Sequence, residues 1–131
     1  MDHTLDAILQ PLAIAVIIDH KVKSVEETAF AVQAAGLLEF FGHDIPSRAD
    51  LLAWFEAQRE TLEDQLWDKG GNTLVLRALA EFKDDAACEA VFDAMVAISL
   101  ADRKYVTEES RLIKSAAAIY GYPLPPLKVD R

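Results

Sequence analysis

One arrangement occurs twice in this chain: an apolar helical segment runs into an aspartate and basic residues, and a second helical segment then starts on paired glutamates. The first copy is IIDHKVKSVEETAF (17–30) and the second is LADRKYVTEESRL (100–112). Helices joined by a short connection pack antiparallel, so the repetition predicts two hairpins that form a four-helix core. A carboxylate at a helix C-terminus opposes the helix dipole, which costs about 0.3–1 kcal/mol when exposed. This occurs at Asp19 and again at Asp102.

The two copies also agree in the spacing of their apolar positions. The same steps back from each aspartate, and forward from the second glutamate of each pair, reach core-facing positions in matching register. Few residues are identical, so the repeat is one of pattern rather than of sequence. The first copy contributes Ile8, Leu12, Val16, Phe30, Ala34, Leu37 and Leu38, and the second contributes Val91, Met95, Ser99, Leu112, Ala116, Ile119 and Tyr120.

Helical periodicity continues through the chain, and no run alternates apolar and polar residues for long enough to indicate a strand. We therefore expect an all-α, single-domain bundle of about six helices over residues 1–121, followed by a proline-rich, extended tail over 122–131. The predicted helices run from about Thr4 to Asp19, Ser24 to Phe41, Ser47 to Gly70, Thr73 to Phe82, Asp84 to Asp102 and Thr107 to Tyr120. The expected start signals are Ser24 with Glu27 in a capping box, Ser47, Asp84 and Thr107, and the expected stops are Gly42, Gly70, Gly71 and Gly121.

Charge and hydropathy exclude two classes of partner. A net charge of −9 has the wrong sign for holding nucleic acid or an anionic membrane surface. The apolar run from Leu5 to Ile18 is shorter than the ~20 residues that a bilayer requires and contains Asp6 and Pro11, so it predicts a buried core helix and no membrane insertion. A lone Cys88 and an N-terminus without a basic signal-peptide start predict a reducing, cytoplasmic setting.

The second copy resembles a known family. LADRKYVTEESRLIKSAAAIYGY is similar to the signature hairpin of the tellurite-resistance TerB-like family, in which A-D-G and two later glutamates precede an amphipathic helix. The similarity covers about 97–122 and, more weakly, 13–42. His20 and Arg103 stand where the family has glycine after the aspartate. The matching residues are Ala101, Asp102, Tyr105, Glu108 and Glu109, and in the first copy Asp19, Val22, Glu26 and Glu27.

The resemblance implies an all-helical domain of paired hairpins without known catalytic activity, which binds a divalent metal through acidic residues. It also implies a role in a bacterial stress-response or tellurite-resistance pathway, with protein partners in membrane-associated complexes.

The acidic residues of the two hairpins are the candidate metal ligands. Calcium takes about six to eight oxygen ligands, and carboxylates that converge from two hairpins supply several of them. The alternative is local, with each aspartate capping its own connection and the glutamates occupying first turns, where negative charge is favourable. No D-x-D-x-D-G loop is present, which excludes an EF-hand. The predicted ligands are Asp19, Glu26, Glu27, Asp102, Glu108 and Glu109.

Two further acidic stripes lead to an alternative function. Like charges at helical spacing form either a solvated helix face or a docking surface for a basic partner. The second possibility describes a metal-free protein-interaction module. The stripes are Asp85, Glu89 and Asp93 on the fifth helix, and Glu56, Glu60 and Glu63 on the third.

Nothing in the sequence indicates an enzyme. The chain has no H-E-x-x-H, nucleophile elbow, P-loop or Gly-rich dinucleotide motif, and its three histidines stand near an end or in loops without a nucleophile nearby. Trp54 and Trp67 lie on a helix whose core face is already filled by leucines. We expect one indole to pack against the tail or the fourth helix, or to anchor an interface.

Overall fold

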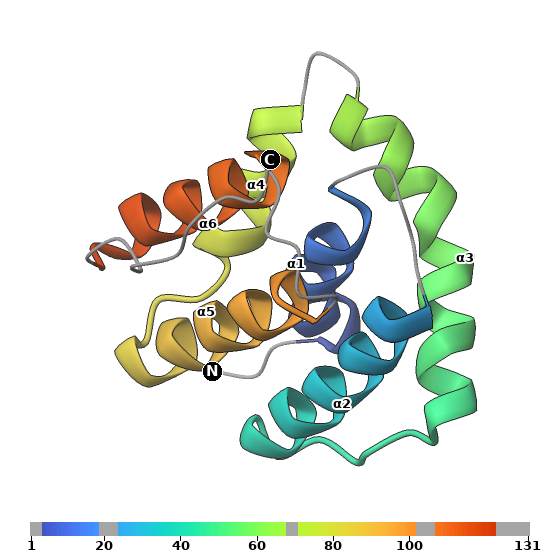
Figure 1. The fold of residues 1–131 in the computed structure, drawn as a ribbon. Coiled ribbons are helices and arrows are strands. Elements are labelled where there is room, and N and C mark those ends of the chain that lie inside the picture. The colour runs from blue at the N-terminus through green and yellow to red at the C-terminus, as the bar shows by residue number, and fades with distance from the viewer. Residues whose placement is uncertain (1–3, 19–23, 68–70, 102–106, 123–131) are drawn as a thin grey trace.

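The computed structural model describes residues 4–18, 24–67, 71–101 and 107–122, and the regular structure within these ranges is entirely helical (Figure 1). In these ranges six helices pack as one small bundle, which confirms the predicted all-α fold. They are α1 (Leu5–Ile17), α2 (Ser24–Phe40), α3 (Arg48–Trp67), α4 (Gly71–Ala80), α5 (Asp85–Ser99) and α6 (Thr107–Tyr120).

Helix α1 lies at the centre because it is apolar on nearly every side. Residues 11–17 are all buried, and α1 contacts α2, α3, α4 and α5. Thr4 caps its start by accepting a hydrogen bond from the N–H of Ala7 at 3.1 Å. The helix passes through Pro11, which lacks the N–H for one backbone hydrogen bond. The prediction of a buried core helix is confirmed.

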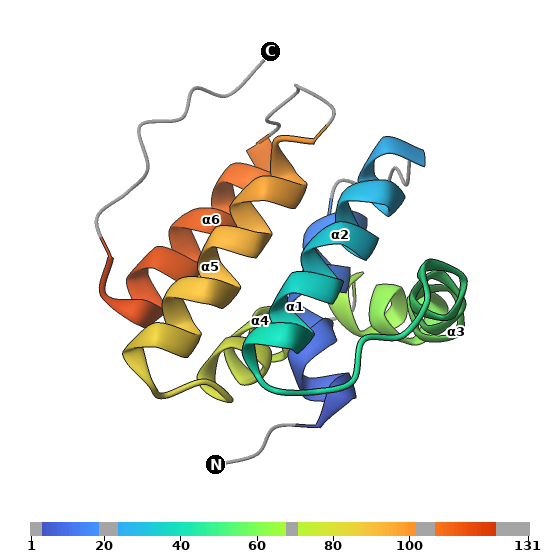
Figure 2. The same ribbon diagram turned by 90° about the horizontal axis from the view of Figure 1, so that it is seen from below.

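The two predicted hairpins are present. α1 packs on α2 and α5 packs on α6, while α2 and α5 lie side by side and join the hairpins (Figure 2). The predicted register is confirmed, because every position in the matching pattern is buried except Ile119 and Tyr120, which are partly buried.

Glycine ends both α2 and α6, as predicted. Gly42 has φ 77° and Gly121 has φ 75°, in the left-handed region that glycine adopts without a steric cost. After the last turn of α2, the N–H of Gly42 donates to the carbonyl oxygen of Glu39 at 3.0 Å, and the N–H of His43 donates to that of Leu38 at 2.9 Å. This pair of bonds is a Schellman motif, which satisfies carbonyls that the helix itself leaves open.

Four predicted helix boundaries were wrong. α1 ends at Ile17 and α5 at Ser99, so both helices stop before the aspartates that were expected to end them. After α5 the backbone forms a tighter turn of the 3₁₀ type, in which the N–H of Ala101 donates to the carbonyl oxygen of Ile98 at 3.1 Å. Helix α4 spans Gly71–Ala80 rather than Thr73 to Phe82, so Gly71 begins a helix instead of ending one.

Two of the four residues that were predicted to cap helix starts do so. The N–H of Asp50 donates to the Ser47 hydroxyl at 3.1 Å, and the N–H of Ala87 donates to the Asp84 carboxylate at 3.2 Å, so both caps are confirmed. Ser24 and Thr107 are the first residues of their helices rather than the flanking cap residues.

Trp54 fixes α3 against the first hairpin. Its indole N–H donates to the Asp6 carboxylate of α1 at 2.7 Å. Its ring stacks on Phe30 of α2, with 6.0 Å between ring centroids and 8° between planes. Trp54 therefore packs on α1 and α2. Residues 123–131 of the tail and the side chain of Trp67 lie outside the described part of the chain.

Two side-chain hydrogen bonds to backbone carbonyl oxygens connect the region of α4 with α5 and α6. The Cys88 thiol donates to the carbonyl oxygen of Phe82 at 3.2 Å, and burial raises the pKa of this thiol. Cys88 is thus a small buried side chain of the core. The Tyr120 hydroxyl of α6 donates to the carbonyl oxygen of Leu79 at 2.9 Å, which ties the second hairpin to α4.

Substitutions at two glycines separate backbone strain from packing. A Cβ added at Gly42 or at Gly36 would meet no atom within 4 Å. We expect Gly42→Ala to lower the free energy of unfolding by about 1–2 kcal/mol, because Gly42 has a positive φ and Gly36 does not. Gly36→Ala, inside α2, should raise it by about 0.5–1 kcal/mol. Urea denaturation measures both changes, and the same sign for the two variants would contradict this account.

A pH dependence is expected from Tyr120. Burial raises the pKa of its phenol well above the ordinary value of about 10, so the unfolded chain loses this proton first and stability falls as the pH rises above about 10. Tyr120→Phe should lower stability at pH 8 by about 0.5–1.5 kcal/mol through the lost hydrogen bond. Above about pH 10, the free energy of unfolding of the wild type should fall with a slope that approaches about 1.4 kcal/mol per pH unit because of this phenol, and Tyr120→Phe should remove that fall. Parallel wild-type and variant pH profiles would contradict the assignment.

Candidate functional site

Four helix ends meet at one end of the bundle, which we call the hairpin end. Figure 2 shows that α1 and α5 finish at the same end of the molecule at which α2 and α6 begin. The connections between these helices carry the predicted ligands Asp19 and Asp102. The described helix ends that flank both connections therefore lie at the same end of the bundle, as a site shared by two hairpins requires.

The buried polar side chains that the structure describes all lie at this end. Within the described part of the chain, three polar or charged residues are buried: Glu26, Ser99 and Ser110. Glu26 lies in the first turn of α2, Ser99 is the last residue of α5, and Ser110 lies in the first turns of α6. The rest of the described core is apolar, so the polar interior coincides with the hairpin end.

Ser99 departs from the packing rule of the repeat. It is 0% exposed, and its hydroxyl has no hydrogen-bond partner among the described residues. In the repeat it occupies the position of Val16, which is equally buried in α1. A buried hydroxyl without a partner loses its hydration and gains nothing in return, so packing alone does not explain a serine at this position.

The neighbouring glutamates of α2 have different surroundings. Glu26 is only 1% exposed, whereas Glu27 is half-buried. Arg59 of α3 lies near Glu27. The pKa of the Arg59 guanidinium is raised chiefly by its hydrogen bond to Glu63, and the charges of Glu63, Glu56 and Glu27 add to this. Glu27 therefore has a cation in its vicinity, and the buried carboxylate of the pair is Glu26.

The structure does not describe the side chains of the other four predicted ligands. Asp19 and Asp102 lie outside the described residues, as do the side chains of Glu108 and Glu109. Among the residues that are described, no three His, Cys, Asp or Glu side chains come together as a metal site. The six-residue metal site therefore stays a prediction, of which the structure describes Glu26 and Glu27.

The two acidic stripes differ in their charge balance. On α3, Arg59 pairs with Glu63 at 2.6 Å and with Glu56 at 3.7 Å, so that stripe is partly neutralised. On α5, the side chains of the predicted stripe are all exposed, and none of them forms an ion pair with another described residue. These are Asp85, Glu89 and Asp93.

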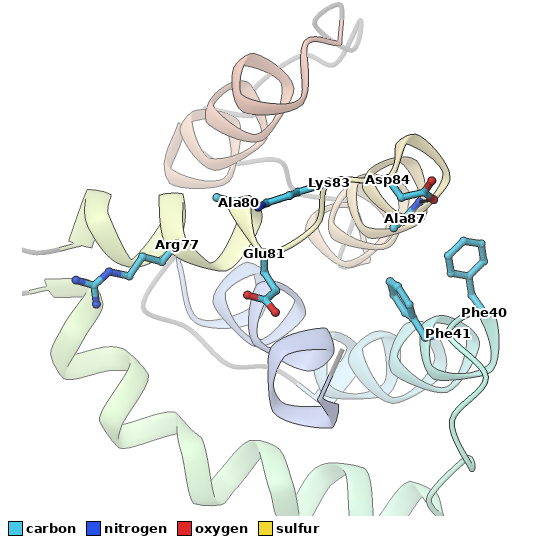
Figure 3. Close-up of a pocket in the computed structure, with 8 residues that line it drawn as sticks. All are labelled: Phe40, Phe41, Arg77, Ala80, Glu81, Lys83, Asp84 and Ala87. Carbon is cyan, nitrogen blue, oxygen red and sulfur yellow. Dashed lines mark hydrogen bonds between the residues drawn. The ribbon is translucent and has the colours of Figure 1, made fainter. Parts of the chain in front are cut away.

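A second surface feature was not predicted. An open groove of about 990 Å³ runs between the end of α2, α4 and the start of α5. Figure 3 shows Phe40 and Phe41 at one side of it, with Asp84 and Ala87 nearby and Arg77 at its far end. Three separate segments form the groove, and only the adjacent Phe40 and Phe41 hint at it in the sequence. Its lining comprises Phe40, Phe41, Arg77, Ala80, Glu81, Lys83, Asp84 and Ala87.

Comparisons with known proteins add no relative. No family model, curated protein or solved structure matches the chain. The TerB-like resemblance therefore stays a prediction that rests on the motif residues alone. Of the helices in the described ranges, none combines the length and the apolar character needed to cross a bilayer.

Two serine substitutions test the state of the Ser99 hydroxyl. In protein treated with a chelator, we expect Ser99→Ala to leave the free energy of unfolding unchanged or to raise it by up to about 1 kcal/mol, because it removes a buried group without a partner. Ser47→Ala makes the same chemical change at a helix cap and should lower stability by about 1 kcal/mol. Thermal and urea unfolding measure both. A loss at Ser99 as large as that at Ser47 would mean that the hydroxyl has a partner.

Proposed function

We propose that this protein is a non-enzymatic, TerB-like binding module that holds a divalent cation, with calcium as the first candidate, at the hairpin end. We further propose that it acts in the cytoplasm, as a scaffold in a bacterial stress or tellurite-resistance type pathway. The observation that carries the cation proposal is that the buried polar side chains among the described residues all lie at the hairpin end.

The chemistry of this end suits a hard cation. Glu26 places a buried carboxylate at this end, and carboxylate oxygens are ligands that hard divalent cations take. Calcium accepts carboxylate oxygens together with water, and a hydroxyl such as that of Ser99 can hydrogen-bond a coordinated water. Further carboxylates, those of Asp19, Asp102 and Glu108, lie close in sequence to the helix ends that meet here.

A second candidate is the metal-free interaction module. It is favoured by the α5 stripe, whose three exposed carboxylates have no ion-pair partner among the described residues. Such a row raises the local concentration of a basic partner at low salt. The two candidates use different parts of the molecule, so one substitution set separates them.

Calorimetric titration tests the cation. Calcium, magnesium, manganese and zinc are titrated separately into chelator-treated protein. We expect micromolar binding of at least one ion, weakened at least tenfold by Glu26→Gln, by Asp19→Asn and by Asp102→Asn. The bound ion should also stabilise the fold, by about 2.7 kcal/mol at a free concentration one hundred times the Kd.

Matched controls make this result specific. Glu60→Gln removes an exposed carboxylate of α3, and Asp93→Asn removes an exposed carboxylate of α5. Each should change the affinity less than threefold. Absence of heat with all four ions, or equal losses in the site and control variants, would reject the cation site and leave the metal-free candidate.

A further inference from the structure

Helix α2 exposes an apolar stripe along its whole length. Val25 is 42% exposed, Val32 61% and Phe40 50%, and together they make up three of the five large apolar side chains that are exposed in the described residues. Ala29 and Gly36 lie between them, so the stripe follows the helical spacing of one face. A helix of a small monomer normally turns such a face inward.

This side of α2 carries little charge. Among its exposed residues Glu39 alone is charged, although 27% of the whole chain is charged. Depletion of charge around apolar side chains is the compositional mark of an interface core. The stripe is thus unlike the surface of α3, where charged residues predominate.

Helix α5 supplies an acidic margin beside the stripe. α2 and α5 run antiparallel and both pack on α1, so their exposed sides face away from α1 together (Figure 2). On its accessible side α5 has the small residues Ala86, Ala90 and Ala97, and beside them the exposed Glu89 and Asp93. The two helices therefore present a shallow apolar strip with negative charge along one edge.

We propose that the α2–α5 face binds an amphipathic helix of a partner protein, with apolar residues at helical spacing and with Lys or Arg along the edge that meets α5. The groove beside Phe40 receives a bulky apolar side chain of that helix. Charge complementarity selects this occupant: two copies of a chain with net charge −9 repel each other, whereas a basic helix is attracted.

The proposed face is separate from the cation site in its chemistry. It uses exposed apolar side chains and the charges of α5, whereas the cation proposal uses buried polar groups of the hairpin end. α2 has 17 residues and is about 25 Å long, so a partner helix of about 15–20 residues spans it.

Three synthetic peptides of about 18 residues are suitable probes. The first places leucines at helical spacing and lysines along one edge. The second has the same composition with the leucine spacing scrambled, and the third has glutamates in place of the lysines. Binding of fluorescein-labelled peptide to the full chain is followed by anisotropy in a buffer with chelator, so that failure of the cation site does not affect the result.

We expect saturable binding of the first peptide, at least tenfold weaker binding of the other two, and an affinity that falls as salt rises. Val32→Gln and Phe40→Gln should each weaken binding at least fivefold. Leu76→Gln, on α4, is the matched control because Leu76 is 52% exposed, and it should have no effect. Combined Glu89→Gln and Asp93→Asn should weaken binding at low salt more than combined Glu60→Gln and Asp64→Asn, which removes two exposed charges of equal spacing on α3.

Four outcomes would overturn the proposal. They are absence of saturable binding by the first peptide, equal binding of the scrambled peptide, equal losses in the α2 variants and Leu76→Gln, and concentration-dependent dimerisation of the protein that Val32→Gln abolishes. The last would assign the face to a second copy of this chain. Sedimentation velocity of the wild type and of Val32→Gln measures this outcome, and circular dichroism shows that the variants are folded.

Discussion

The structure depends on the burial of α1 from almost every direction. This helix offers hardly any polar side to water, so each neighbour that packs on it removes apolar surface from solvent. Four helices do so, and their positions around α1 determine which of them touch one another. The antiparallel contact of α2 with α5 and the position of α3 across the first hairpin both follow from the need to enclose α1. Trp54 then fixes α3 in place through Asp6 and Phe30.

Around this apolar centre, the polar interior of the hairpin end is an exception to the packing pattern. The repeat places matching residues in both hairpins, and the fold accommodates Val16 at one of these positions and Ser99 at its counterpart. The hydroxyl of Ser99 has no hydrogen-bond partner among the described residues, whereas Val16 has no polar group to satisfy. Departures from local packing rules concentrate at functional sites in natural proteins. Ser99 is therefore the described core residue that packing explains least.

Periodicity in the sequence was sufficient for the hairpins but not for every boundary or surface. The buried positions of α1, α2 and α5 repeat at helical spacing, and caps such as Ser47 and Gly42 act locally, so both were predictable. The ends of α1 and α5 were placed too late because an aspartate after an apolar run does not show where the last hydrogen-bonded turn closes. The Phe40 groove and the packing of Trp54 depend on segments distant in sequence, which periodicity does not report. The exposed stripe of α2 was missed because that helix is apolar on its buried side as well.

The central position of α1 also bears on how the chain is made. α1 lies near the N-terminus, whereas α5, one of its main neighbours, is completed about 80 residues later. At translation rates of about 5–20 residues per second, this interval is roughly 4–16 s. During this interval α1, which has almost no polar side, is not yet covered by α5. Folding of this protein on the ribosome is therefore coupled to the emergence of the second hairpin, and the nascent first half is the form most exposed to chaperones and to aggregation.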